Sequence, residues 1–175
     1  MKYCLLAILS FLLIVPGSCK KSTSGGNSGT VTIDNTTTLG QTYYVYGFLF
    51  SQGKKVPTSG NPQPDITVDN DGTNLLLQAS NLKNSFYKAG EYSDEVSAEA
   101  AYANLKSATI AESDWLAWAY GIVPNQIWIY RSGAGTYAKF LITSTVAEVR
   151  NGHNYAECTF EWEYQPDGSL TFPGK

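Results

Sequence analysis

Three consecutive segments in the last third of the chain have the composition of strands, and they constrain the fold most strongly. They span residues 126–131, 136–149 and 154–165. Apolar and polar residues alternate along the third segment, as in a half-buried strand. A Gly-Ala-Gly sequence separates the first two segments, and Asn151-Gly152 lies between the second and third, which is a strong signal for a tight hairpin. We therefore predict an antiparallel meander and a mostly β fold.

Other segments extend this prediction to the rest of the chain. Five more strands are expected, at residues 31–34, 42–51, 65–68, 74–79 and 169–172. One helix is expected over residues 98–108, with Ser97 as its N-cap and Asp94-Glu95 as an extension backward by one turn. The predicted fold is an antiparallel two-sheet or sandwich-like domain with one helix. It occupies residues 30–175 as a single domain.

The N-terminus has the pattern of a bacterial lipoprotein signal. Lys2 gives a cationic start, residues 4–15 are mostly apolar, and small residues precede Cys19. An apolar run of about a dozen residues is shorter than the roughly 20 that a membrane-spanning helix needs. We expect residues 1–18 to be removed as a signal peptide. Cys19 then carries the lipid (palmitate among its acyl chains) that anchors the protein to a membrane.

One position departs from that signal. Pro16 stands where lipoprotein signals usually have leucine, so the alternative is an ordinary secretory signal cut near Ser18, with Cys19 unmodified. The region 19–29 consists of the lipidated Cys19 and a stretch rich in Ser and Gly that is expected to be a flexible tether.

Charge and cysteine content limit the partners and the cross-links. The chain has 12 Lys and Arg against 15 Asp and Glu, which argues against a nucleic-acid partner, because such a partner needs clustered positive charge. Of the three cysteines, Cys4 lies in the signal and Cys19 is the lipid site, so the folded part retains only Cys158 and no disulfide within the domain is expected. Cys158 lies on the apolar face of its strand and is expected to be structural rather than nucleophilic.

The strand-and-turn sequences of the last third resemble those of a known family. Residues 127–131 (IWIYR), 135–140 (GTYAKF) and 159–169 (TFEWEYQPDGS) are similar to the C-terminal meander of the HmuY-like lipoproteins, and residues 48–68 resemble the front of that fold. The resemblance implies a membrane-anchored, mostly β protein. Founding members of the family capture haem outside the cell. The shared motifs encode strands and turns, so the resemblance supports a similar fold more strongly than a similar binding site.

The haem function of that family does not transfer directly. The resemblance implies haem iron held by two His side chains, with Met in some relatives. This chain has one histidine, His153, and its one methionine is Met1. Ligation by two histidines within one chain is therefore excluded. His153 follows the Asn-Gly turn and is expected to be an exposed turn residue, with a role as haem ligand as the alternative.

An aromatic segment offers another candidate ligand surface. Residues 114–120 read DWLAWAY and contain Trp115, Trp118 and Tyr120. Their flat faces could stack on sugars, porphyrins or peptide side chains. The alternative is that Trp115 and Trp118 hold a short helix or loop against the sheet as part of the core.

Residues for metal binding or catalysis are sparse. A zinc site needs three or four converging ligands, and one His and one Cys in the folded part argue against such a site. Asp65, Asp69 and Asp71 offer oxygen ligands for calcium, but they lack the spacing and the glutamate of the twelve-residue calcium loop and fit a hairpin turn better. The chain has no Gly-x-Ser-x-Gly motif. We expect no catalytic residue, no metal site and no enzyme.

These patterns lead to one expected function and one alternative. We expect an envelope lipoprotein that captures haem or a glycan for an outer-membrane uptake protein. The alternative is a structural lipoprotein that docks another envelope protein and binds no small ligand. In bacteria with this family, surface-exported lipoproteins often carry an acidic run after the lipidated cysteine, whereas here Lys20-Lys21 follow Cys19. We therefore expect an outer-membrane lipid anchor facing the periplasm rather than the cell surface.

Overall fold

The structure is a computed structural model, and it describes residues 27–36, 46–81 and 83–173. The expected signal peptide, Cys19 and most of the tether lie outside the described residues, as does the beginning of the strand expected at 42–51. Among the described residues, no helix has the length and apolar character needed to cross a membrane.

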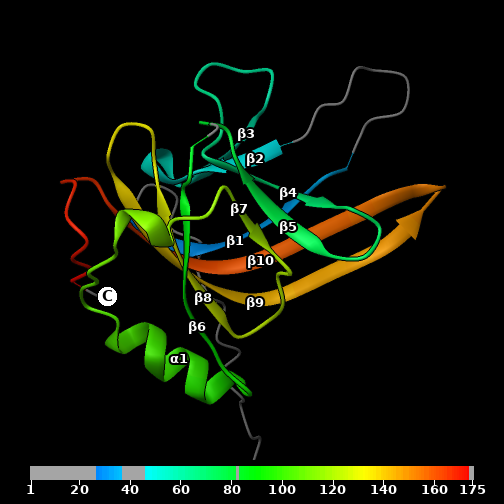
Figure 1. The fold of residues 1–175 in the computed structure, drawn as a ribbon. Helices are drawn as coiled ribbons and strands as arrows, with labels where there is room; N and C mark the ends of the chain where they lie inside the picture. The colour runs from blue at the N-terminus through cyan, green and yellow to red at the C-terminus, as the bar shows by residue number, and fades with distance from the viewer. Residues whose placement is uncertain (1–26, 37–45, 82, 174–175) are drawn as a thin grey trace, which may run out of the picture.

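Two antiparallel five-stranded sheets pack face to face, which confirms the predicted mostly β, two-sheet fold (Figure 1). The strands of the first sheet are, in spatial order, β1 (Ser28–Asp34), β10 (His153–Gln165), β9 (Tyr137–Arg150), β8 (Gln126–Arg131) and β6 (Phe86–Glu91). Those of the second sheet are β3 (Lys54–Pro57), β2 (Tyr46–Leu49), β4 (Ile66–Asn70), β5 (Leu75–Ala79) and β7 (Trp118–Tyr120).

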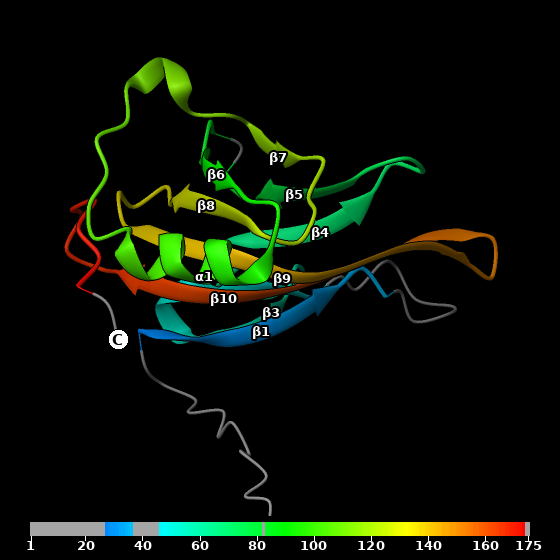
Figure 2. The same cartoon turned by 90° about the horizontal axis from the view of Figure 1, so that it is seen from below.

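The predicted meander is formed by β8, β9 and β10 of the first sheet. Asn151 and Gly152 both have positive φ at the β9–β10 turn, as a tight Asn-Gly hairpin requires. β10 points Ala156, Cys158 and Phe160 into the core, so the alternation in the sequence correctly predicted the buried face. β9 and β10 pair along nearly their whole length, and their hairpin extends beyond the other strands (Figure 2).

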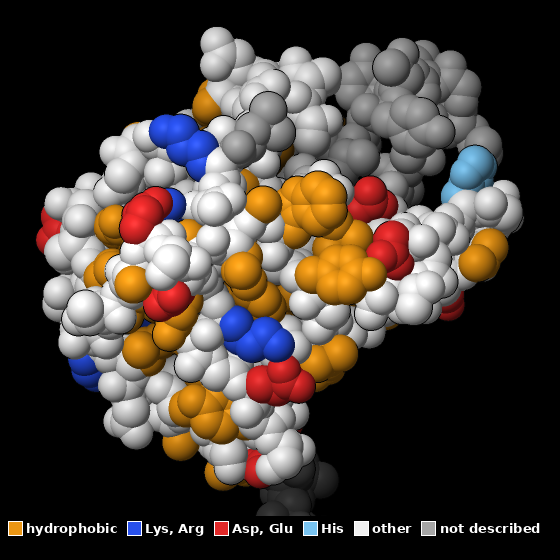
Figure 3. Space-filling view, viewed as in Figure 1, with side chains coloured by type: hydrophobic (Ala, Val, Ile, Leu, Met, Phe, Trp, Pro, Cys, Tyr) orange, Lys and Arg blue, Asp and Glu red, His pale blue; other side chains and the backbone are white. Residues whose placement is uncertain are grey.

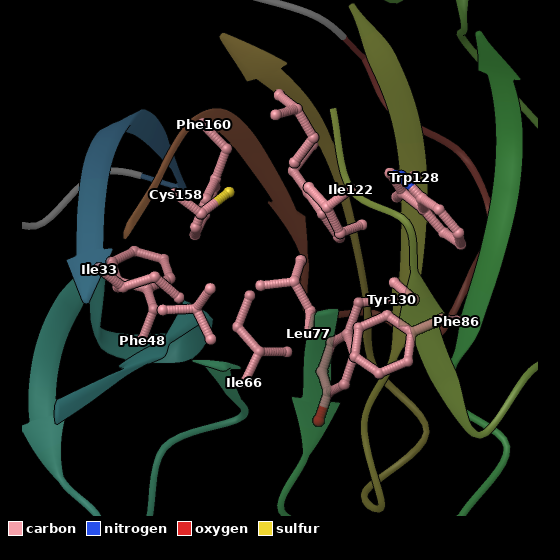
Figure 4. Packing of buried hydrophobic residues seen from close by; sticks show 14 of the residues in the cluster. Ile33, Phe48, Ile66, Leu77, Phe86, Ile122, Trp128, Tyr130, Cys158 and Phe160 are labelled. Atoms are coloured by element: carbon pink, nitrogen blue, oxygen red, sulfur yellow. The ribbon is translucent and has the colours of Figure 1, made fainter. Parts of the chain in front are cut away.

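The main core lies between the two sheets and is rich in aromatic rings. Phe48 and Phe50, on the side of the second sheet, meet Phe160 and Trp162 of β10 with ring centroids 5.1–6.3 Å apart. Figure 4 shows labelled side chains from both sheets converging on this space. Edge-to-face and tilted ring pairs of this kind add to the free energy gained by burying apolar area.

The helix α1 (Glu95–Asn104) packs on the outer face of the first sheet, across β8 and β9 (Figure 2). Asp94 is its N-cap, because the Asp94 carboxylate accepts a hydrogen bond from the Ser97 backbone N–H at 2.8 Å. The prediction of Ser97 as N-cap is therefore wrong, and the extension through Asp94 and Glu95 is confirmed. The helix ends at Asn104, earlier than the predicted end at residue 108.

Several predicted strand boundaries differ from the structure. The strand expected at 42–51 ends at Leu49, where a 3₁₀ turn (Phe50–Gln52) and Gly53, with φ 59°, lead the chain into β3. The strand expected at 169–172 is reduced to one bridge between Thr171 and Ser107. The strand expected at 31–34 begins at Ser28, since the residues from Ser28 onward already pair with β10.

Candidate functional site

The edge strand β7 presents two aromatic side chains on the outer face of the second sheet. Successive side chains of a strand point to opposite faces, and Ala119 is fully buried in the core. Trp118 and Tyr120 therefore point outward, and they are 57% and 49% exposed. Figure 3 shows hydrophobic side chains gathered on this side of the molecule with acidic side chains beside them.

The Tyr120 ring is held by the turn between β4 and β5. Its hydroxyl donates to Asp71 Oδ2 at 2.5 Å and accepts from Asn74 Nδ2 at 2.9 Å. Asp71 Oδ1 in turn accepts the backbone N–H groups of Thr73 and Asn74. The hydrogen bond from Tyr120 is the main influence that lowers the pKa of Asp71, and the same bond raises the pKa of Tyr120. At neutral pH this network therefore joins a charged carboxylate to a protonated phenol.

Polar side chains continue this surface across β5 and β4. Strand register aligns two rows on the outer face: Trp118, Gln78 and Thr67 in one, and Tyr120, Leu76 and Asp69 in the other. Adjacent strands lie about 4.8 Å apart, so each aromatic ring has a polar side chain one or two strand spacings away. The site is therefore an aromatic edge with polar side chains beside it, and the apolar Leu76, which is 5% exposed, lies between Tyr120 and Asp69. We call it the β7 surface, made of Trp118, Tyr120, Asp69, Asp71, Asn74, Leu76 and Gln78.

Trp115 lies apart from the β7 surface. It is 4% exposed and packs with Ile129 and Phe172 in a second buried cluster on the outer face of the first sheet. The Arg131 guanidinium lies 4.5 Å from the centre of its ring and is paired with Glu112. The structure thus separates the three predicted aromatic residues: Trp118 and Tyr120 are on the surface, and Trp115 has the core position that was its alternative.

His153 is exposed and lies beside the β9–β10 turn. A hollow of about 180 Å³ next to it is lined by mostly polar residues, including Arg150, Asn154 and Tyr155. Small-molecule pockets are usually larger, about 300–1,000 Å³, and mostly apolar. One exposed imidazole beside a small polar hollow does not fit haem, which is held by axial ligands in an enclosing pocket.

The three carboxylates considered for calcium point to different partners. Asp65 accepts hydrogen bonds from the Phe50 N–H at 2.9 Å and the Tyr130 hydroxyl at 3.2 Å, and its burial raises its pKa. Asp69 accepts from the backbone N–H of the next residue, and Asp71 is engaged with Tyr120. Within the part of the chain that the structure describes, no group of three or more His, Cys, Asp or Glu could hold a metal ion.

Cys158 is a fully buried free thiol in the main core. Burial raises the pKa of this thiol, and only the thiolate is strongly reactive. We predict that iodoacetamide at neutral pH leaves Cys158 unmodified in the native protein and alkylates it fully in denaturant. Peptide mapping by mass spectrometry separates Cys158 from the other cysteines. Native labelling at the rate of a free thiol would contradict a buried position.

No family model, curated protein or solved structure matches the chain. The HmuY-like resemblance therefore stays a prediction from the residues themselves.

Sequence reasoning selected the aromatic residues of the β7 surface but not the polar residues around them. The sequence places Asp71 in a hairpin turn, and nothing in the sequence indicates that this turn holds Tyr120. That contact follows from the pairing of β5 with β7, two segments far apart in the chain. A local pattern carries no signal for such a pairing.

Proposed function

We propose that this protein is an envelope lipoprotein whose domain captures a glycan on the β7 surface. The observation that carries the proposal is the position of Tyr120, whose exposed ring is fixed by hydrogen bonds to Asp71 and Asn74. The proposed lipid on Cys19 and the tether would hold this surface near a membrane, where an outer-membrane uptake protein could receive the ligand.

A fixed, exposed aromatic ring suits ligand binding. Ordering a side chain costs conformational entropy, and the Tyr120 ring is ordered although half of its surface is exposed to solvent. A ligand that stacks on an ordered ring loses less free energy to ordering the site. Fixing the ring in advance therefore lowers the entropy cost of binding a ligand. A ring that binds no ligand would gain nothing from this order.

The chemistry of the surface favours a glycan over haem. Aromatic faces stack on the apolar faces of sugar rings, while nearby amides and carboxylates bond to sugar hydroxyl groups. The β7 surface offers both, with Gln78, Asn74 and Asp71 beside the rings. Haem would need an iron ligand, and His153 lies on the separate β9–β10 hairpin.

One feature favours the alternative of docking to another envelope protein. β8 pairs with β9 only between Tyr137 and Leu141, and much of the rest of β9 is exposed, including Val149. An open strand edge can accept an extended segment of a partner through backbone hydrogen bonds. This second candidate function would use the β9–β10 hairpin and leave the β7 surface unused.

A glycan array with the purified full chain tests the proposal. We predict that the wild-type protein retains a defined set of glycans and that Trp118→Ala and Tyr120→Ala each weaken retention at least about tenfold, since each removes a stacking face. Tyr46→Ala is the matched control, because Tyr46 is 48% exposed on β2 and lies outside the surface. Circular dichroism checks that each variant folds.

Two outcomes would overturn this function. Equal glycan retention by Trp118→Ala and the wild-type protein would place the site elsewhere. A saturable haem titration with a sharpened Soret band, together with an empty array, would replace glycan capture with haem capture.

A further inference from the structure

We infer that the β7 surface takes an uncharged, extended glycan of at least two sugar units that lies along β7, and that Asp69 and Asp71 disfavour acidic glycans. This inference rests on the proposed function and adds the chemical class of the ligand. Three features of the surface support it: the spacing of the rings, the two carboxylates and the hydrogen-bonding groups.

The spacing of the rings favours an extended chain. Trp118 and Tyr120 are two residues apart on one face of one strand, and a strand rises about 3.3–3.4 Å per residue, which places their Cα atoms about 7 Å apart. Two rings in line at this distance offer separate stacking faces to neighbouring units of a linear chain. A single sugar would cover only one of them.

The charge of the surface disfavours an acidic ligand. Asp69 and Asp71 lie in or beside the Tyr120 row. Within the described residues, the ion pairs formed by Lys and Arg side chains involve other carboxylates. Screening at physiological salt acts over about 8 Å, so a carboxylate or sulfate on a sugar stacked over Tyr120 would be repelled mainly by Asp71, which is bonded to the Tyr120 hydroxyl. Asp69 lies two strand spacings from Tyr120 and adds a weaker repulsion.

The hydrogen-bonding groups favour a ligand rich in donors. A carboxylate has about four acceptor positions and no donor, and Asp71 uses three of them for the Tyr120 hydroxyl and for the backbone N–H groups of Thr73 and Asn74. A sugar hydroxyl group can donate to the position that is left on Oδ2, whereas an ionised uronic acid or a sulfate brings further acceptors. The Gln78 amide, beside Trp118, can both donate and accept.

Tryptophan fluorescence can follow binding at this surface directly. The chain has four tryptophans, of which Trp115, Trp128 and Trp162 are buried and Trp118 is exposed. Acrylamide quenching of the native protein therefore reports mainly on Trp118. A glycan stacked on this ring lowers the quenching constant, and Trp118→Phe removes the signal without removing an aromatic face.

The experiment measures protection from acrylamide by glucose, cellobiose, cellohexaose, maltohexaose and hexagalacturonate. We expect at least one neutral hexasaccharide to protect Trp118 and to bind at least tenfold more tightly than glucose and than hexagalacturonate. Asp69→Asn should narrow the difference in affinity between neutral and acidic chains. Glu95→Gln, which removes a charge from the remote helix α1, should leave this difference in affinity unchanged.

The outcomes separate this inference from the function on which it rests. Equal affinity for glucose and the hexasaccharides, or for neutral and acidic chains, would overturn the inference while glycan binding stands. If neither these probes nor any glycan on the array binds the wild-type protein, the proposed function fails and the inference fails with it.

Discussion

Replacing Lys139 with methionine is expected to lower the free energy of unfolding by about 3–5 kcal/mol, the usual effect of removing one partner of a buried ion pair. Lys139 is 1% exposed on β9, and its Nζ lies 3.2 Å from Glu163 Oε2. It also donates to the backbone carbonyls of Tyr102 and Leu105 at 3.0 and 2.9 Å, at the C-terminal end of α1. The substitution removes the charge opposite Glu163 and the donor that these carbonyls use.

The double variant Lys139→Met/Glu163→Leu should be more stable than the single variant. Burial is the largest influence on the pKa of Lys139 and lowers it, although Glu163 acts in the opposite direction. Burial of the ammonium and the charge of Lys106 together outweigh the attraction of Glu163, and apolar replacement of both partners removes both desolvation costs. We expect the second substitution to recover about half of the loss, because the helix carbonyls still lack their donor.

Urea denaturation at pH 7 measures these differences. Lys88→Met is the matched control, since Lys88 forms an exposed i,i+3 pair with Glu91 and such pairs contribute at most about 1 kcal/mol. A loss for Lys139→Met as small as that of the control would contradict a buried, helix-capping role for Lys139.

The predictable parts of the fold are those in which a local sequence pattern has a single physical cause. β10 alternates because one face meets the core and the other does not, so its buried face could be deduced from period-two hydrophobicity alone. β7 has three residues, too few to show an alternation. β6 was missed because Lys88 and Gly90 are weak strand formers and the strand is bulged between them.

The start of the helix could not be predicted for a different reason. Asp94 and Ser97 are both favourable N-caps, and local preference does not rank them. In the structure Asp94 takes the cap, and Ser97 becomes the residue whose backbone N–H donates to it. The same short-range chemistry thus supported two helix starts three residues apart.

The candidate site was predictable only in its aromatic residues. Trp115 and Trp118 look alike in the sequence, yet one is buried beside Phe172 and the other is exposed. What separates them is long-range pairing. Leu116 bridges to Phe86 of β6, while Trp118 pairs with Gln78 of β5, so the chain passes from one sheet to the other between the two tryptophans.

Truncating Phe160 to alanine is expected to lower the free energy of unfolding by about 3–5 kcal/mol, through lost burial and the cavity that remains. Phe160 is fully buried on β10, with its ring centroid 5.7 Å from Phe48 and 5.4 Å from Phe140. Phe48 belongs to the second sheet and Phe140 to the first. The cavity would therefore open where the two sheets meet, and Phe160→Leu, which retains most of the volume, should cost about 1.5 kcal/mol or less.

A double-mutant cycle tests whether this loss belongs to the contact between the sheets. Phe160→Ala combined with Phe48→Leu should show a coupling energy of about 0.5–3 kcal/mol in urea denaturation, because the two rings touch. Phe160→Ala combined with Val96→Ala on the exposed side of α1 should be additive within about 0.5 kcal/mol. Additivity in both cycles would mean that Phe160 stabilises the protein through contacts within the first sheet and not through its contact with Phe48. Coupling with Phe48 alone would make the aromatic contact between the sheets the source of the lost stability.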